Sequence, residues 1–355
     1  MRALSSGWAR GWRAELFGSP ARALATLALA ALLGWALWSA LDWAVWHAVF
    51  RADAQACRAA APHGACWGVV AEKWRPILFA RYPFDGQWRP AVAAGLLLGL
   101  LGVTAWPRCW RPWLAAAWAG ALGLCGLLLH GGVAGLDVVP TSRWGGLPLT
   151  LGLAILGLAL AFPLGLLLAL GRRSRWPVPR RLCATYIELV RGVPLISVLF
   201  MASFLVPLLW PVGSQPDVLV RVLAGIVLFV AAYLAEIVRG GLQAVPPGQV
   251  EVARALGLTP WQVQRHVVLP QALRVSVPAL MNAVIGTLKD TSLVTVVGLF
   301  ELTGALGLAL GGDPVWRPFY LEGYLFIAAV YWGLCFGLSR YSLWLERRLA
   351  RQPAG

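Results

Sequence analysis

The stretch EVARALGLTPWQVQRHVVLP, residues 251–270, lies between two apolar runs and decides the fold. Just before it, Pro246 and Pro247 can open a short helix, because proline is favoured at the first position of a helix. Gly257 can end that helix, because a C-terminal glycine accepts the left-handed backbone that commonly follows a last turn. The pattern therefore predicts a short helix followed by a break.

A second helix is predicted directly after the break. Thr259 is a suitable N-cap, Pro260 follows at the first helical position, and Gln262 stands three residues after the cap. This spacing is that of a capping box, in which the two side chains satisfy each other's backbone N–H groups. Pro270 is expected to close this helix before the chain enters the membrane.

Ala253 and Ala255 in the first helix are small, so this helix could sit close to a partner and seat in a groove on another protein. By local features alone, the segment could equally be a simple polar connector.

The composition indicates a membrane protein. Hydrophobic residues make up 59% and charged residues 13%, and the mean hydropathy is +0.70. A soluble domain carries about 25% charged and about 45–50% apolar residues, so a soluble chain of this composition could not cover its surface with polar groups. The net charge of +15 comes from short basic clusters between apolar runs, and no nucleic-acid-binding motif is present. We therefore expect no nucleic-acid partner.

Hydropathy predicts an all-α integral membrane protein with about eight transmembrane helices, because about 20 apolar residues cross a bilayer. The predicted spans are residues 24–41, 91–106, 113–129, 148–170, 192–212, 218–238, 275–300 and 324–338.

The distribution of basic residues predicts the orientation. Cytoplasmic segments are enriched in Lys and Arg, and residues 171–181 alone carry five arginines. This places both termini and residues 239–274 in the cytoplasm, including the N-terminal Arg2, Arg10 and Arg13. Residues 42–90 then form a periplasmic loop. The expected location is the bacterial inner membrane, with several crossings.

Two cysteines lie in that outer loop. Cys57 and Cys66 are separated by eight residues and could form a small loop-closing disulfide in an oxidising periplasm. The alternative is two free thiols in a structured loop. The other four cysteines lie in or beside spans at unrelated spacing and are interpreted as small apolar fillers.

The decisive stretch resembles the EAA loop of the permeases of ATP-driven (ABC-type) importers. That family pattern has E-A-A, three residues, G, nine residues and I-x-L-P. Here Val252 replaces the second residue of the pattern and Val267 the isoleucine, with no gap. In the family this loop is the coupling helix that docks on a separate ATPase. The resemblance implies that role for Glu251, Ala253, Arg254, Gly257, Leu269 and Pro270.

Further segments resemble the polar amino-acid permeases of this superfamily, and in particular the M-type permease of general L-amino-acid uptake systems. They are ELVRGVPLISVLF (188–200), AYLAEIVRGGLQAVPPGQ (232–249), LKDTSLVTVVGLFEL (288–302), WRPFYLEGYLF (316–326), SRYSLWLERR (339–348) and CRAAAPHGACW (57–67).

The resemblance implies a domain organisation. Residues 146–348 would form the type I permease domain with five helices, and residues 1–145 an added section with three helices. Residues 349–355 would be a cytoplasmic tail.

The chain has no chemistry of its own that could supply energy. ATP hydrolysis needs a phosphate-binding loop ending in Gly-Lys-Ser/Thr, but the only lysines, Lys73 and Lys289, do not follow a glycine. The four histidines are scattered, so neither a metal site nor a metalloprotease motif is expected, and no nucleophile elbow is present. We therefore predict no enzyme activity and no cofactor in this chain, with Mg-ATP bound by a partner ATPase.

Charged residues inside a span are costly and commonly face a cavity or a partner. Lys289 and Asp290 fall past the middle of the seventh predicted span. A zwitterionic amino acid needs one group of each sign along its route, so we expect Lys289, Asp290, Thr291 and Ser292 to line or gate the pathway. The alternative is a self-neutralised pair that packs the core of a permease dimer. Glu188/Arg191 and Glu236/Arg239 are more simply explained as ion pairs near span ends.

The expected partners follow from the resemblance. They are an ABC ATPase homodimer, a second permease of similar fold, a periplasmic amino-acid-binding protein and the lipid bilayer, although the chain alone does not exclude a permease homodimer. Two other classes of membrane protein share some of these features. An ion-coupled secondary transporter would not need an EAA loop and would be expected to contain inverted repeats. A membrane enzyme or assembly factor lacks a catalytic set here.

Overall fold

The chain is almost entirely helical. A computed structural model describes residues 15–61, 63–211 and 213–351. Within these residues there are no strands, only two isolated bridges, so the predicted all-α class is confirmed. Some of the residues predicted to be cytoplasmic lie outside the described residues, namely Arg2, Arg10, Arg13 and positions 352–355 of the predicted tail.

Among the described residues, six helical stretches are long and apolar enough to cross a membrane. They are Pro20–Trp46, Trp113–His130, Gly146–Arg172, Val218–Ala244, Pro260–Val297 and Arg317–Leu349. A bent pair of helices adds a seventh span if the pair is counted as one. The remaining predicted span, 91–106, is helix α5 (Trp88–Thr104), whose 17 residues lie at the lower limit for a membrane helix.

The chain divides into two compact units. The first consists of residues up to Glu72 together with Pro318–Glu322. It contains α2 (Pro20–Leu41), a π-helical turn Asp42–Trp46, α3 (Ala54–Ala60) and the start of α4 (Gly68–Phe79). None of the residues of α2 is buried by the chain itself, as expected of an apolar helix whose solvent is lipid.

A disulfide organises the outer part of this first unit. Cys57, in α3, is joined to Cys66, with their Cα atoms 5.2 Å apart and both residues fully buried. The backbone N–H of Cys66 donates a 2.8 Å hydrogen bond to Oε1 of Glu322, which is also buried. Of the two alternatives for these cysteines, the structure contains the disulfide rather than two free thiols.

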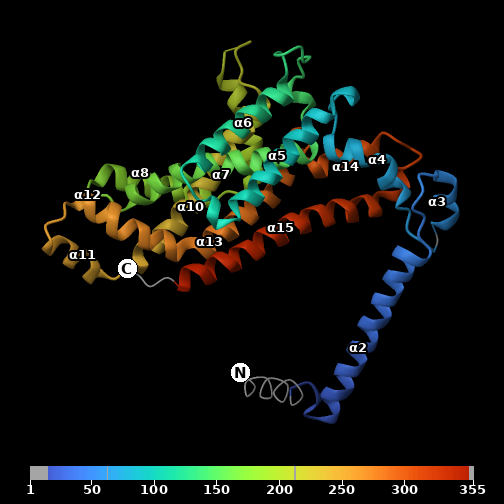
Figure 1. The fold of residues 1–355 in the computed structure, drawn as a ribbon, viewed down its shortest axis with the longest axis horizontal. Coiled ribbons are helices and arrows are strands. Elements are labelled where there is room, and N and C mark those ends of the chain that lie inside the picture. Colours follow the sequence, from blue (N-terminus) through green and yellow to red (C-terminus); the bar gives the residue numbers. More distant parts are fainter. Residues whose placement is uncertain (1–14, 62, 212, 352–355) are drawn as a thin grey trace. The chain divides into compact units, whose positions relative to one another are not determined.

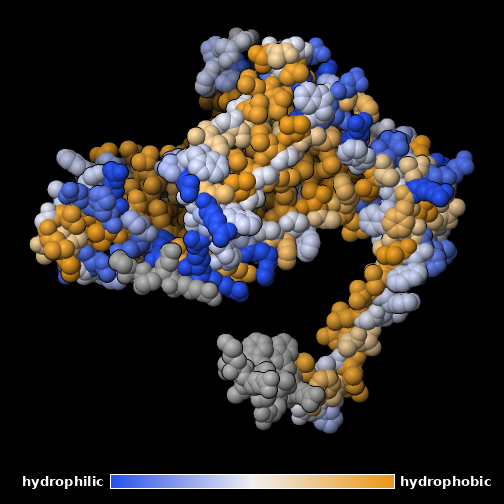
Figure 2. All heavy atoms as spheres, viewed as in Figure 1, coloured by the Kyte–Doolittle hydropathy of each residue, from blue (hydrophilic) through white to orange (hydrophobic). Residues whose placement is uncertain are grey.

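The second unit is built around α10 (Val218–Ala244), which packs against α7 (Gly146–Arg172), α8 (Pro177–Arg191) and α13 (Leu269–Asp290) (Figure 1). The other helices are α5, α6 (Trp113–His130), α9 (Leu195–Phe200), α11 (Pro247–Ala255), α12 (Pro260–Gln262), α14 (Leu302–Gly311) and α15 (Tyr320–Arg351). Figure 2 shows apolar atoms over α5 and α6 and hydrophilic side chains gathered near α11 and the C-terminal half of α15.

The predicted span 192–212 is not a separate straight helix in the structure. The structure bends by 103° between Pro177–Arg191 and Leu195–Leu209. Pro194 is the cap of α9 and has extended backbone, and the residue before a proline is itself disfavoured in the helical conformation. The apolar run that hydropathy detects is therefore only the second arm of a broken element, and α8 is its first arm.

Two other predicted spans have different ends. The predicted span 275–300 leaves the α-helix at Asp290 and continues as a 3-10 helix, Thr291–Val297. The predicted span 324–338 is only the middle of α15, which has 32 residues. Hydropathy reports where a helix is apolar, but α15 contains no proline and so continues beyond its apolar stretch.

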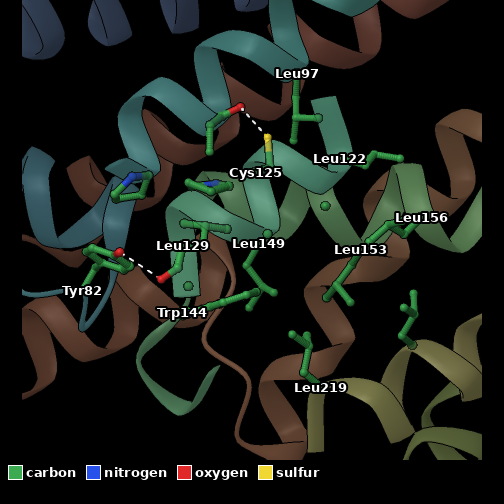
Figure 3. A pocket seen from close by; sticks show the side chains of 17 residues that line it. Tyr82, Leu97, Leu122, Cys125, Leu129, Trp144, Leu149, Leu153, Leu156 and Leu219 are labelled. Carbon is green, nitrogen blue, oxygen red and sulfur yellow. Dashed lines mark hydrogen bonds between the residues drawn. The ribbon is translucent and has the colours of Figure 1, made fainter. Parts of the chain in front are cut away.

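Helices α5 and α6 pack on the start of α7. Between them lies an apolar cavity of about 110 Å³ lined by residues such as Leu97, Leu129 and Leu149 (Figure 3). The hydroxyl of Tyr82 donates to the carbonyl of Leu129 over 3.0 Å at its edge. Burial raises the pKa of this phenol. The division of the chain at residue 145 stays a prediction, since α5 and α6 belong to the same compact unit as the later helices.

An ion pair joins α4 to the segment between α14 and α15. Nζ of Lys73, in α4, is 2.7 Å from Oδ2 of Asp313, between α14 and α15. The hydrogen bond from Lys73 holds the pKa of the Asp313 carboxyl below its ordinary value, so the pair persists at neutral pH. It connects two segments that are far apart in the sequence.

Gly241 sets the distance between α10 and α13. A Cβ atom there would lie 2.4 Å from the backbone carbonyl oxygen of Ala272 and 2.1 Å from Oγ of Ser276, which is too close for either to tolerate. We predict that Gly241→Ala destabilises the protein by about 1–3 kcal/mol, the usual cost of overpacking. The measurement is the thermal midpoint of the purified protein in detergent.

Gly240→Ala is the matched control, because a Cβ atom at Gly240 would meet no atom within 4 Å. We expect this variant to melt at or slightly above the native temperature, since alanine favours a helix more than glycine. Equal midpoints for Gly240→Ala and Gly241→Ala would contradict the close packing.

Candidate functional site

The segment between α10 and α13 contains the predicted helix and break. Pro246 caps α11, and Pro247 is its first residue. The helix ends in a Schellman turn: the N–H of Leu258 donates to the carbonyl of Ala253 over 3.2 Å, and that of Gly257 to Arg254 over 2.9 Å. Gly257 has φ +81°, which glycine adopts without steric cost.

The second helix also begins as its sequence predicts. The side chain of Thr259 accepts from the N–H of Gln262 over 3.4 Å, and Oε1 of Gln262 accepts from the N–H of Thr259 over 2.9 Å. Both bonds of the capping box are therefore present. This fixes the start of α12 at Pro260, with four residues between it and Ala255, the last residue of α11, so the break is short and well defined.

Pro270 does not close this helix, contrary to the prediction. The backbone changes to a π-helix over Val263–Val268 and then continues as α13, with Leu269 and Pro270 at its first positions. A proline in a regular α-helix clashes with the carbonyl four residues earlier and leaves it without a donor. The wider π turn relieves this conflict, because the N–H of Leu269 bonds back five residues to Gln264.

The two faces of α11 differ sharply. Ala253 is only 4% exposed and packs with Val263, Val268 and Ala272 in a cluster that also contains residues of α7, α8 and α10. We expected its small side chain to let the helix approach a partner protein. In the structure, it lets α11 approach the chain's own core.

The outer face of the segment is apolar, which the sequence analysis missed. Val252 is 61%, Leu256 77% and Trp261 65% exposed, and Glu251 and Arg254 are exposed beside them. Val252 and Leu256 are four residues apart and so share one face of the helix. That four-residue spacing was the available sequence signal for a shared face.

An ionic cluster lies where α7, α8 and α10 meet. The carboxylate of Glu236 bonds to Arg239 within α10 and lies 3.5 Å from Arg172 and 3.9 Å from Arg191. Nη2 of Arg172 is 2.8 Å from Oε1 of Glu188. The predicted Glu236/Arg239 pair is therefore present, whereas Glu188 pairs with Arg172 of α7 rather than with Arg191. The cluster holds the first arm of the broken element to the bundle.

The predicted pathway residues lie at the far end of α13 from the coupling segment. Lys289 and Asp290 are its last two residues; Lys289 is exposed and Asp290 is half-buried. Ser292 is half-buried in the following 3-10 helix. Thr291 is only 1% exposed and donates to the carbonyl of Leu288 over 2.7 Å, so in this conformation it packs internally.

One buried carboxylate near these residues was not predicted. Glu301 is fully buried and is the N-cap of α14. Its oxygens lie within hydrogen-bond distance of the hydroxyls of Thr150, Thr295 and Tyr331 and the N–H groups of Thr303 and Gly304. The contact with the N–H of Thr303, two residues later, is the usual one for an N-cap and has a local sequence signal. The contacts with Thr150 of α7 and Tyr331 of α15 join distant segments and have none.

Two of the cavities are apolar and offer no competing polar site. The cavity beside α7 is lined mainly by leucine, alanine and glycine, with no carboxylate or amine (Figure 3). A larger groove of about 480 Å³ between α5, α7, α13 and α15 is lined in the same way. Within the described part of the chain, no three His, Cys, Asp or Glu side chains group as a metal site.

Comparison with known proteins gives consistent relatives. A family model for binding-protein-dependent transport system inner membrane components matches residues 161–351. The inner membrane amino-acid ABC transporter permease protein YhdY of Escherichia coli K12 is 47% identical over 291 residues, which cover 80% of this chain and 78% of that protein.

Two further relatives support this result. The glutamate/glutamine/aspartate/asparagine transport system permease protein BztC of Rhodobacter capsulatus is 37% identical, over 81% of this chain and 80% of its own length. A solved structure of an amino acid ABC transporter with histidines aligns with TM-score 0.51 and 33% identity, over 56% of this chain and 90% of that one.

The turn at Gly257 can be tested directly. We predict that Gly257→Ala loosens the turn between α11 and α12, because a left-handed backbone costs an L-residue about 1–2 kcal/mol. Hydrogen exchange of residues 251–262 should become faster. Gly248→Ala is the control, since Gly248 is exposed, a Cβ atom there would meet nothing within 4 Å and its φ is not positive. Unchanged exchange in Gly257→Ala would contradict the claim that this turn needs a glycine at its left-handed position.

Proposed function

This chain belongs to the family of binding-protein-dependent transport system inner membrane components, and on that premise we propose that it is the permease subunit of an ATP-driven ABC importer of L-amino acids. It is a multi-pass protein of the inner membrane. Its relatives are named as permeases of amino-acid transport systems, and the same cargo class is proposed here. The particular amino acids are left open.

The observation that carries the proposal is the segment 251–270. It combines the EAA-loop pattern with a rigid, doubly capped geometry and an exposed apolar face. Val252, Leu256 and Trp261 would fill a groove on the ATPase, and Glu251 and Arg254 would pair with charges at its rim. An exposed apolar patch with a polar border is typical of a protein interaction site.

The contacts of α11 explain how force could reach the pathway. Ala253 packs against Val263, Val268 and Ala272, at the beginning of the long element that ends with Lys289 and Asp290. A displacement of α11 by the ATPase would therefore move the start of α13 with it. Close-packed interiors transmit such displacements because they leave no space for local collapse.

We propose that Lys289, Asp290 and Ser292 contact the amino acid near one end of the pathway, and that Thr291 supports them from the buried side. Neighbouring groups of opposite sign suit the carboxylate and ammonium of a zwitterion. The exposure of Lys289 in this single chain is compatible with a cavity that a second permease completes. ATP binding must favour one of two conformations, which requires that they contact the ATPase differently.

The proposed assembly contains four kinds of protein. An ATPase homodimer binds Mg-ATP and docks on residues 251–270 from the cytoplasm, where both termini also lie. A second permease of similar fold completes the channel. A periplasmic binding protein delivers the amino acid to the outer loops 131–147 and 301–323. In this proposal the ATPase, not this chain, binds ATP, because the sequence here has no Gly-Lys-Ser/Thr loop.

An ion-coupled secondary transporter remains the alternative from a different class. It would move its substrate without an ATPase, so the exposed face of α11 would have no partner. The segment 251–270 discriminates between the two readings, since only the importer requires it to transmit force.

We predict that Glu251→Lys abolishes coupling. Reversing the charge at an exposed rim position should repel or misorient the ATPase, because like charges at an interface cost several kcal/mol. ATP-dependent amino-acid uptake by the reconstituted complex should fall at least tenfold. The permease should keep its thermal midpoint, because Glu251 is exposed.

Glu15→Lys is the matched control, with the same charge change at an exposed residue outside the segment. It should transport normally. Normal ATP-driven uptake in Glu251→Lys would count against docking at this site.

We predict that Lys289→Ala and Asp290→Asn each raise the KM for uptake by about tenfold, since a hydrogen bond to a charged group contributes about 1.5–3 kcal/mol. The measurement is the concentration dependence of uptake by correctly assembled complexes. If both variants transport with native KM, rate and selectivity, the pathway role fails and the pair serves only packing.

A further inference from the structure

Glu301 is a fully buried carboxylate with an unusually complete set of donors. Its Oε1 accepts from the N–H groups of Thr303 and Gly304 over 2.8 and 3.1 Å and from the hydroxyl of Thr295 over 3.1 Å. Its Oε2 accepts from the hydroxyl of Tyr331 over 2.7 Å. The hydroxyl of Thr150 lies 3.3 Å from the same oxygen. In the described part of the chain, no Lys or Arg is paired with it.

These partners suit the ionised carboxylate. A backbone N–H can only donate, so Oε1 must accept, and a carboxylate offers about four acceptor positions on its two oxygens. The N–H groups belong to the first turn of α14, where the partial positive charge of a helix N-terminus favours an anion. The negative charge is thus balanced by oriented dipoles. Because these donors occupy the acceptor positions of the carboxylate, little capacity is left for a ligand.

The partners of Glu301 come from four different elements. Thr150 is in α7, Thr295 in the 3-10 helix Thr291–Val297, Thr303 in α14 and Tyr331 in α15. The contacts are tight: a Cβ atom at Gly304 would lie 2.6 Å from Oγ1 of Thr295. One carboxylate therefore joins the 3-10 helix to three surrounding helices.

Further contacts join the cluster to the residues at the end of α13. The hydroxyl of Tyr331 also lies near the side chains of Thr291 and Thr303. Thr291 immediately follows Lys289 and Asp290 in the chain. On the other side of Glu301, the carbonyl of Phe300 accepts from the N–H of Gly146 over 2.9 Å, which ties the same turn to the start of α7.

We propose that Glu301 is the positioning residue for the substrate contacts at this end of the pathway. Its carboxylate clamps the 3-10 helix Thr291–Val297 to α7, α14 and α15, and so fixes the backbone that carries Lys289, Asp290 and Ser292. The part of this inference that concerns substrate rests on the proposed function. Glu301 itself does not touch the amino acid.

The variant Glu301→Asp distinguishes two roles of Glu301: its hydrogen bonds to the other elements, which form the clamp, and its hydrogen bonds to the first turn of α14, which form the helix cap. Aspartate is a good N-cap and keeps the charge at the first turn of α14. Its side chain is shorter by one methylene, so it cannot reach the α14 amides and also the hydroxyls of Tyr331 and Thr150. Tyr331→Phe is the complementary variant, since it removes one hydroxyl and leaves the ring and Glu301 in place.

The first measurement is hydrogen exchange of the full-length protein, which does not depend on transport. Both variants should increase exchange of residues 291–297 about tenfold, while residues 251–262 stay protected as in the native chain. The second measurement is uptake by the complete complex, in which the KM for amino acid should rise about tenfold. A purely structural role would reduce the amount of folded complex but leave the KM of that complex unchanged.

Glu322→Gln is the control, because Glu322 is also buried but bonds to the N–H of Cys66 in the other compact unit. It should change neither the exchange of residues 291–297 nor the KM. Native exchange of residues 291–297 in both Glu301→Asp and Tyr331→Phe would overturn the clamp. Faster exchange with native KM would overturn the positioning role alone. If the native complex shows no ATP-driven uptake, the proposed function fails while the exchange result still decides the clamp.

Discussion

Where a helix ends or breaks, its backbone N–H and carbonyl groups lose their partners within the helix, and other groups must replace those hydrogen bonds. Three such points lie along residues 255–304. At residues 255–259, a Schellman turn and a capping box satisfy the backbone. At residues 263–268, a π turn accommodates Pro270. At residues 291–304, the carboxylate of Glu301 accepts the free N–H groups of the next helix.

These points lie at opposite ends of one long element, Pro260–Val297. At one end lies the exposed face, formed by Val252 and Leu256 of the preceding segment together with Trp261 of α12, and the other end carries Lys289 and Asp290. Because Ala253 is packed into the cluster that also holds the start of this element, a force on the exposed face is not lost in a flexible loop. The arrangement separates the surface that would receive the force from the residues that would meet the substrate.

Local sequence rules correctly predicted the helix end and helix start at residues 255–259. The positions of Pro247, Gly257, Thr259 and Gln262 specify helix ends through interactions within five residues, so they can be read without a structure. The fold class and most spans follow from hydropathy for a similar reason, since lipid imposes one requirement on every span. The coupling loop itself was recognised by family resemblance.

The remaining features depend on contacts between distant segments. Nothing near Ala253 in the sequence says that it faces the core. Pro194 marks a local break before α9, but only the structure shows that α8 packs on α10 as the first arm of the broken element. The cluster around Glu301 joins residues 151 positions apart, so a single glutamate after an apolar run gave no indication of it. Pro270 was misjudged because the π turn that admits it has no simple sequence signature.

The central claim is that ATP hydrolysis by a docked ATPase drives amino-acid movement through this chain. The most direct test is uptake into vesicles containing the purified complex and a binding protein, with ATP or a non-hydrolysable analogue on the ATPase side. Accumulation that requires hydrolysable ATP and persists when ion gradients are dissipated is the predicted result. Accumulation by this chain without an ATPase, driven by an ion gradient, would contradict the account.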